Sequence, residues 1–283
     1  MLRIISFTIL FLGLLLFISC RKQIEVDVFD FEEQVCVNAM LIADNSMKVH
    51  VSMAQKMGNS QLPTIENAQV FIRHDDENYM LTHEHSGIYT ANIPVMSNTS
   101  YSCIVTADGS TVTANCKIPE KPKLLSVLIN PVGWIDEEGI PMPLFELGLD
   151  NTANDTLYYE VYVYSYSKHI LSSMGTYEYD SEESAGIFSN KGKQGDSFTK
   201  QIRFWRRTWG SNQTYAYILE IRALNKDAYL YLKSKGIYDL GRFPEFGVSS
   251  PVAYNIYNNI ENGSGIFAGY SAVATDTLYE IIQ

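Results

Sequence analysis

The sequence predicts an all-β protein whose first half is an immunoglobulin-like β-sandwich, and three observations lead to that prediction. Short segments that alternate apolar and polar residues follow one another along residues 35–118, giving about seven strands in about 90 residues, as such sandwiches have. Turn-forming pairs such as Asp44-Asn45 and Asp108-Gly109 separate these segments. No stretch of this region repeats its apolar residues with the period of a helix. We therefore expect residues 34–118 to form a sandwich that serves as a spacer or a binding platform.

The expected strands of this region each place apolar residues on one face, as a half-buried sheet requires. They are residues 35–41, 48–53, 68–73, 78–82, 87–93, 101–107 and 110–118. Cys103 and Cys116 fall on the two arms of the last hairpin, where they are expected to be diagonal neighbours. A disulfide bridge and a pair of buried free thiols both fit this placement, and we favour free thiols.

A second β domain is expected over residues 119–283, because the stiff polar segment Pro119-Glu120-Lys121-Pro122 ends the first one. This domain is richer in aromatic residues. Its residues 158–166 read YYEVYVYSY and are apolar on both sides, which predicts a strand that is covered on both faces. The other expected strands are residues 124–130, 143–149, 197–205, 215–223 and 265–274.

One short helix and one long loop complete the expected second domain. Residues 225–235 carry a helical apolar stripe, with Asn225 as the N-terminal cap and Gly236 as the stop. Residues 172–193 are polar and contain glycine, so we expect a long loop there. A loop of that length in a compact domain is either functional or mobile.

The N-terminal sequence predicts export to a membrane. Arg3 precedes an apolar run over residues 4–18, which is the pattern of a secretory signal peptide. The run is shorter than the ~20 apolar residues that a membrane-spanning helix needs. It ends in the letters FISC, which resemble a bacterial lipobox and make Cys20 the expected lipidation site. We expect residues 1–19 to be removed and residues 20–33 to form a lipidated tether, since two or more acyl chains anchor a protein stably.

Composition and motifs exclude several classes of function. A formal net charge of −11 and a pI near 4.9 give a surface that repels phosphate backbones, so we expect no nucleic-acid partner. The sequence has no phosphate-binding glycine loop and no dinucleotide fingerprint, and we expect no cofactor. His83 and His85 lack a third ligand for a metal. Ser264 does not lie in the Gly-x-Ser-x-Gly motif of a serine hydrolase, so we expect no enzyme. Glycoside cleavage by two carboxylates that the fold brings together stays an open alternative.

The best candidate for a contact site is the sequence FWRRTW at residues 204–209. Trp205, Arg206, Arg207 and Trp209 belong to residue types that are enriched at binding hot spots. A strand end with one indole in the core and its arginines in water gives the same pattern. Core packing is the favoured explanation of the two, and the cluster still ranks first among candidate contact sites.

A likeness to a known family is strongest near the C-terminal end. Residues 259–271 read NIENGSGIFAGYS, and the stretches AYLYLKS at residues 228–234 and IENAQV at residues 65–70 precede them. Together with the start of the mature chain at Cys20, these motifs resemble a family of Bacteroidota lipoproteins named domain of unknown function 4249. The likeness covers nearly the whole mature chain, with the motifs in order.

The resemblance implies a location and a kind of partner rather than a chemistry, because no catalytic residue belongs to the family's pattern. Members of the family are often encoded beside TonB-dependent outer-membrane receptors. The resemblance therefore implies a non-catalytic lipoprotein anchored in the outer membrane, on its periplasmic or cell-surface side. Such a protein would be an accessory or ligand-binding partner of a TonB-dependent β-barrel receptor, its ligand being unknown. The alternative is a structural or adhesive module of the cell surface.

Two further expectations concern particular residues of these motifs. Gly263, Gly265 and Gly269 suit a turn, a bulge or a close backbone approach, and we favour a scaffold over a ligand contact for that motif. The triplet Asp-Thr-Leu occurs at Thr156 and at Thr277 and resembles the O-glycosylation acceptor of exported Bacteroidota proteins. Both threonines are weak candidate glycosylation sites, because chance explains so short a triplet almost as well.

Overall fold

The computed structural model describes residues 33–55, 63–153, 155–169, 176–206, 213–242 and 255–280. The chain divides into two units, Met1–Glu32 and Glu33–Gln283, and all of the described residues belong to the second unit. Cys20, the signal peptide and nearly all of the expected tether therefore lie outside the described residues. The fold reported below is that of the second unit alone.

The prediction of an all-β protein is confirmed, since the described residues form fifteen strands and one helix. In chain order the strands are β1 (Val35–Ile42), β2 (Ser46–Met53), β3 (Gln69–His74), β4 (Glu77–His85), β5 (Ile88–Pro94), β6 (Ser100–Ala107), β7 (Ser110–Lys117), β8 (Leu124–Ile135), β9 (Pro141–Asp150), β10 (Tyr158–His169), β11 (Glu178–Ser189), β12 (Ser197–Arg203), β13 (Gln213–Leu224), β14 (Ser264–Ala274) and β15 (Leu278–Tyr279). The helix is α2 (Lys226–Arg242). Over the described ranges, no helix has the length and apolar character needed to cross a membrane.

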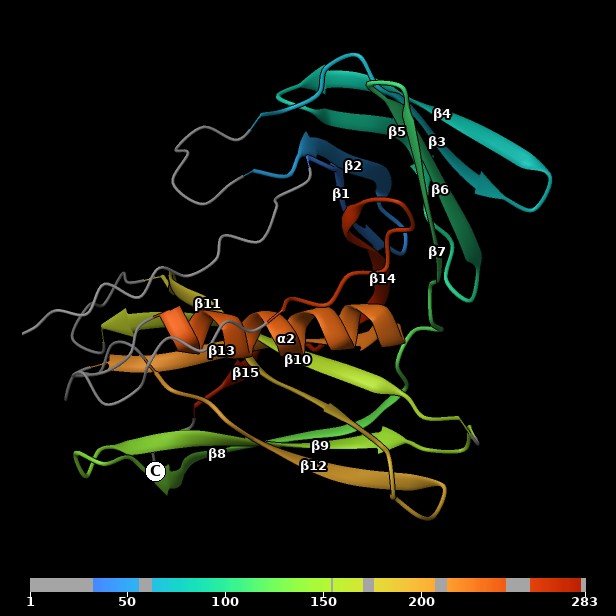
Figure 1. Cartoon of the computed structure of the whole chain (residues 1–283). Coiled ribbons are helices and arrows are strands. Elements are labelled where there is room, and N and C mark those ends of the chain that lie inside the picture. The colour runs from blue at the N-terminus through green and yellow to red at the C-terminus, as the bar shows by residue number, and fades with distance from the viewer. Residues whose placement is uncertain are drawn as a thin grey trace, which may run out of the picture. The chain divides into compact units, whose positions relative to one another are not determined.

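The strands form two sheets. The larger sheet runs in the order β11-β10-β13-β14-β1-β2-β5-β4-β3-β6-β7, and β15 pairs with β13 beside this path. The smaller sheet has the order β12-β9-β8 (Figure 1). Because β14 stands next to β1 in the larger sheet, hydrogen-bonded strands continue from the first half of the sequence into the second.

β14 makes this connection by pairing on both of its edges. It runs parallel to β1, with Val37 opposite Gly265, and antiparallel to β13. Gly265 has a φ of +114°, and a Cβ built there would lie 2.1 Å from the carbonyl oxygen of Val37. The expected close backbone approach at this glycine is therefore confirmed. The predicted domain boundary at residue 119 stays a prediction, although β14 places Phe267 in the apolar core of the first seven strands.

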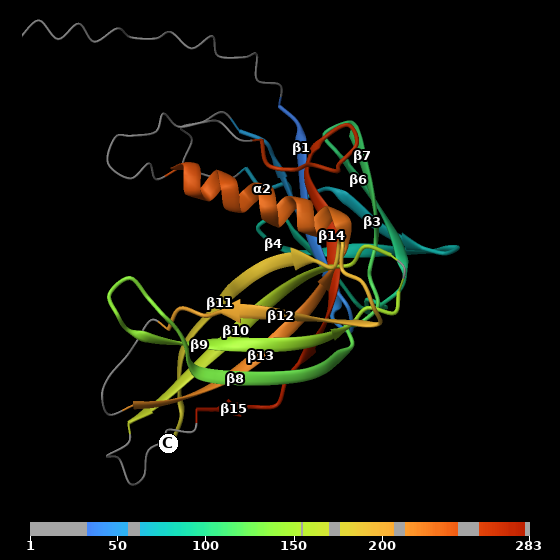
Figure 2. The same ribbon diagram turned by 90° about the horizontal axis from the view of Figure 1, so that it is seen from below.

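Two large apolar cores and a smaller cluster under α2 stabilise the unit. The first lies among β1 to β7 and β14 and contains fully buried side chains such as Val49 and Val105. The second lies between the small sheet and the β10 and β13 strands, and includes Phe145 and Val161. Figure 1 shows β8, β9 and β12 as a layer below β10 and β13, and Figure 2 shows the same three strands overlying β10 and β13 when seen from below. The apolar residues that alternate along these strands therefore face the cores, and the polar residues between them face outward.

The prediction that residues 158–166 are covered on both faces is confirmed for the face of Val161 and Val163, whereas the tyrosines of the opposite face are only partly covered. Val161 and Val163 face the second core. On the other face Tyr158 packs against Tyr229 of α2, with ring centroids 4.6 Å apart. Tyr164 on the same face is only half-buried.

The expected long loop over residues 172–193 is wrong for most of its length, because Glu178–Ser189 forms β11 and pairs with β10. This strand lies at the edge of the large sheet and has few apolar residues, so its sequence lacks the usual signal. Even its buried position Ser181 is polar. A register shift next to Gly186 interrupts the alternation further.

The expected helix is present, and it is longer than predicted. Its cap is confirmed, because the Oδ1 of Asn225 accepts a hydrogen bond from the N–H of Ala228 at 2.8 Å. α2 continues through Gly236, the predicted stop. A glycine within a helix costs only about 1 kcal/mol relative to alanine, so packing of residues such as Leu232 against the sheet outweighs it.

The three cysteines in the described part of the chain are free thiols, as favoured from the sequence. Cys103 lies opposite Ala114, and Cys116 lies opposite Tyr101, which makes the two cysteines diagonal neighbours as expected. Burial raises the pKa of Cys103 to about 12 and also raises the pKa of Cys116. Both thiols therefore stay protonated and pack as small apolar side chains.

Candidate functional site

The predicted contact cluster is described only in part, because Arg207 and Trp209 lie outside the described residues. Trp205 comes shortly after β12 and is 50% exposed. Its indole meets that of Trp134 edge to face, with ring centroids 4.8 Å apart. Half of the Trp205 surface is therefore accessible to a partner, and its role as a contact residue stays a prediction.

Arg206 is held by groups of the protein itself. Its Nη1 donates to both carboxylate oxygens of Glu280, at 2.8 and 3.0 Å, and its Nη2 donates to the carbonyl oxygen of Pro141 at 3.0 Å. The guanidinium also lies 4.2 Å from the ring centre of Tyr215. Only 10% of the Arg206 side chain is exposed. We therefore assign Arg206 a structural role, in which it holds Glu280 beside β13, and its role in a ligand contact stays a prediction.

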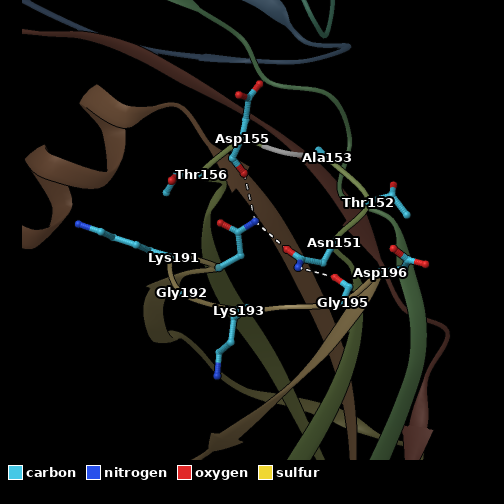
Figure 3. Close-up of a pocket in the computed structure, with 11 residues that line it drawn as sticks. Asn151, Thr152, Ala153, Asp155, Thr156, Lys191, Gly192, Lys193, Gly195 and Asp196 are labelled. Carbon is cyan, nitrogen blue, oxygen red and sulfur yellow. Dashed lines mark hydrogen bonds between the residues drawn. The ribbon is translucent and has the colours of Figure 1, made fainter.

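A polar hollow that the sequence did not reveal lies between the loop after β9 and the loop after β11 (Figure 3). Residues 151–153, 155 and 156 line one side, and residues 190–193, 195 and 196 line the other. The volume of the hollow is about 330 Å³, which falls in the range of small-ligand sites. Loops held by rigid strands are a common place for binding residues.

Asn190 joins the two walls of this hollow through its side-chain hydrogen bonds. Its buried amide donates from Nδ2 to the Oδ1 of Asn151 at 2.8 Å and to the carbonyl oxygen of Asp155 at 3.2 Å. Its Oδ1 accepts from the N–H of Leu157 at 2.8 Å. Asn151 in turn donates to the carbonyl oxygen of Gly195 at 2.8 Å. These bonds fix both loops before any ligand arrives, which lowers the entropy lost on binding.

A second and larger hollow, of about 690 Å³, shares one wall with the first. Thr152, Ala153, Asp155 and Thr156 line both of them. The other walls of the larger hollow are the connector of residues 119–123, the end of β7, the start of β10 and the start of α2. The two hollows therefore form adjoining parts of one candidate site, with the exposed Thr156 hydroxyl between them.

Lysine side chains surround this site in a chain whose formal net charge is −11. Six lysines and four carboxylate residues line the two hollows, and the lysines are Lys117, Lys121, Lys123, Lys191, Lys193 and Lys226. The hydroxyl and the N–H of Thr152 hydrogen-bond to Asp150 and hold the pKa of that carboxyl below its usual value. Asp150 is therefore ionised at neutral pH. Lys121 is already ion-paired with Asp44. The other five lysines still outnumber the four carboxylate residues, and this small local excess of cations suits an anionic ligand.

The side chains that line the two hollows are mainly lysines, carboxylates, threonines and amides. None of the described residues that line the hollows is a histidine, cysteine or serine, the side chains that most often act as nucleophile or general base. In the part of the chain that the structure describes, no three histidine, cysteine or acidic residues gather as metal ligands would. Thr156 and Thr277 are both exposed, and their glycosylation stays a prediction.

The comparisons with known proteins identify a family and leave its chemistry open. The sequence profile of the family described as "Domain of unknown function (DUF4249)" matches residues 21–276. No curated protein matches the chain. Because the profile spans most of the sequence, the resemblance stated from the motifs is confirmed for the family itself.

Among solved structures the likenesses are distant. One is to a Salmonella alpha-2-macroglobulin mutant, with 8% identity, a TM-score of 0.23, and coverage of 69% of this chain but only 14% of the other. Another is to a provisionally described carbohydrate binding protein from Bacteroides uniformis, with 13% identity, a TM-score of 0.19, and coverage of 68% and 89% of the two chains. Scores this low carry no argument about function. What the comparisons establish is that the chain belongs to the family described as Domain of unknown function (DUF4249).

Proposed function

We propose that the chain is a non-catalytic lipoprotein of the Bacteroidota outer membrane, anchored by lipid on Cys20. Its ligand is a hydroxyl-rich anion, such as an acidic sugar, which binds in the two adjoining hollows. Through this binding it acts as an accessory partner of a TonB-dependent β-barrel receptor, the kind of partner that the family resemblance implies.

The observation that carries the binding proposal is the pair of hollows with a shared wall and a lysine rim. Their walls combine ammonium groups, which attract an anion, with the exposed Thr156 hydroxyl and the carboxylates of Asp155 and Asp196, which hydrogen-bond to hydroxyls. The hydrogen bonds of Asn190 hold the walls in place. A ligand with a carboxylate and several hydroxyl groups matches both kinds of group.

The membrane anchor is supported by the N-terminal sequence. The apolar run of residues 4–18 ends at Ser19-Cys20 as a lipobox does. Acylation of such a cysteine supplies the two or more acyl chains that stable anchoring needs.

The experiment uses the full chain with a C-terminal affinity tag in a Bacteroidota host fed a clickable fatty acid. We expect the fatty acid to label the wild-type protein and a Cys36→Ala variant, and to be absent from a Cys20→Ala variant. Extraction in mild detergent should bring a β-barrel receptor with the wild-type protein, identified by mass spectrometry.

Each part of the proposal has its own contradicting outcome in that experiment. Equal label on wild type and Cys20→Ala would rule out the lipid anchor. A labelled protein that leaves the membrane with no β-barrel receptor would contradict the accessory role and favour the structural or adhesive module.

A further inference from the structure

The β8 strand presents an apolar edge to solvent. It is the last strand of the small sheet, and within the described residues no strand pairs with its other edge (Figure 2). Four of its apolar side chains are more than half exposed: Leu125 at 58%, Leu128 at 63%, Val132 at 62% and Ile135 at 65%. Edge strands that stay uncovered usually carry charges, because a bare apolar edge promotes association. The twelve residues of β8, LLSVLINPVGWI, contain no charged side chain.

The charges that flank β8 have opposite signs at its two ends. Lys121 and Lys123 precede the strand, and Asp136, Glu137 and Glu138 follow it. The carboxylate of Asp136 accepts hydrogen bonds from the N–H groups of Glu138 and Ile140 at 3.0 and 2.7 Å, which fixes this acidic turn. Lys123, Glu137 and Glu138 are exposed.

The charges at the two ends of β8 attract those of a second copy only when the two β8 strands run antiparallel. In that orientation the lysine end of each copy meets the acidic end of the other, whereas a parallel arrangement brings like charges together. The formal net charge of −11 makes two copies repel each other over most of their surfaces outside the lysine-rimmed hollows. The uncharged strip of β8, with its oppositely charged ends, is therefore a part of the surface that attracts a second copy.

We propose that a second copy of this chain docks on β8 about a two-fold axis near Asn130. The two β8 strands run antiparallel, so that the exposed apolar side chains on either side of Asn130 pack on those of the other copy, and the Lys123 end of each copy faces the Glu137 end of the other. The register shifts of β8 at residues 124–126 and 130–134 leave the side-chain pairing irregular. Such a contact is isologous and closes at two copies, so it ends in a dimer rather than a fibre. Pro131 lacks an N–H, so the apolar side chains and the charged ends contribute more than a continuous hydrogen-bond ladder does.

The test cross-links the full-length protein in its membrane. A cysteine at Asn130→Cys lies beside its symmetry mate, so a short bis-maleimide reagent should convert most of that variant to a band of twice the mass. Thr199→Cys is the matched control, because this exposed residue lies on β12 at the opposite edge of the small sheet. It should stay at the mass of one chain.

Charge reversal in the Asn130→Cys background then tests the contact itself. Lys123→Glu and Glu137→Lys should each lower cross-linking by about tenfold or more, and the double variant should restore it. Leu128→Lys should abolish cross-linking, whereas Met80→Lys on β4 should not, although the native side chains are 63% and 64% exposed. No dimer band with Asn130→Cys, no rescue in the double variant, or cross-links to a different protein would overturn the proposal.

Discussion

Replacing Gly265 with alanine is expected to destabilise the protein by about 3 kcal/mol or more, since strain and overpacking each cost about 1–3 kcal/mol. The φ of +114° at Gly265 is one that residues with a Cβ rarely adopt. The added Cβ would also lie 2.1 Å from the carbonyl oxygen and 2.9 Å from the carbonyl carbon of Val37, both backbone atoms of β1. The parallel pairing of β14 with β1 must shift to admit it. Thermal denaturation followed by circular dichroism measures the loss, as a fall in Tm of roughly 6 °C or more.

Two other glycines separate the causes of this effect. Gly109 has a φ of +76° and nothing within 4 Å of an added Cβ, so Gly109→Ala reports the cost of positive φ alone, about 1–2 kcal/mol. Gly236 lies in α2 with nothing within 4 Å, and Gly236→Ala should be neutral or slightly stabilising. If Gly265→Ala costs no more than Gly109→Ala, the close approach of β14 to β1 is not what requires the glycine.

Replacing Arg206 with methionine is expected to cost about 3–5 kcal/mol at neutral pH, because it leaves a buried carboxylate without its cation. Glu280 has only 6% of its side chain exposed, and its remaining side-chain partner is the Tyr217 hydroxyl, which donates to Oε1 at 2.8 Å. The matched control is Arg203→Met three residues earlier, where the side chain is exposed beside Trp134. That variant should lose less than about 1 kcal/mol. Urea unfolding of the three proteins measures the difference.

The pH dependence of the Arg206→Met variant has a defined sign. Burial already raises the pKa of Glu280, against the lowering effect of Arg206, and loss of the cation raises it further. A folded-state pKa above the unfolded value of 4.5 means that the folded state binds the extra proton. The deficit relative to wild type should therefore be smallest below pH 4.5 and grow as pH rises through the folded-state pKa. Adding Glu280→Gln should recover part of the stability, and a deficit independent of pH would contradict this account.

The sequence predicted most strands because their alternation is local, and it missed features that depend on distant partners. Residues 35–41 alternate, and β1 appears there, but no local signal shows that its parallel partner is β14. β11 was missed because an edge strand needs little apolar surface. The structural role of Arg206 depends on Glu280, which is 74 residues away along the chain. The pattern of residue types around Trp205 could not reveal that partner.

The sequence did not predict the candidate site, because its residues are also distant from one another along the chain. Asn151 and Asn190 lie 39 residues apart, and only the folded loops bring them together. The sequence NKGKQGD at residues 190–196 held a signal, because two lysines among glycines are typical of an exposed binding turn. Residues 190–193 fall within the predicted long loop, which was expected to be either functional or mobile, but the sequence did not show which residues would face it. The lysines of the larger hollow come from β7, the connector and α2, which no single stretch of sequence displays together.

The most direct test of the binding proposal is isothermal titration of the full-length protein in detergent with glucuronate, an acidic sugar, and with glucose as its neutral counterpart. We expect glucuronate to bind more tightly than glucose, with an affinity that falls as salt is added. Lys193→Ala and Lys226→Ala, one lysine from each hollow, should each weaken glucuronate binding by about tenfold, as the loss of a charged hydrogen bond does. Lys200→Ala on β12, outside both hollows, should leave the affinity unchanged. Equal binding of the two sugars, no binding of glucuronate, or full affinity in both hollow variants would contradict the proposal.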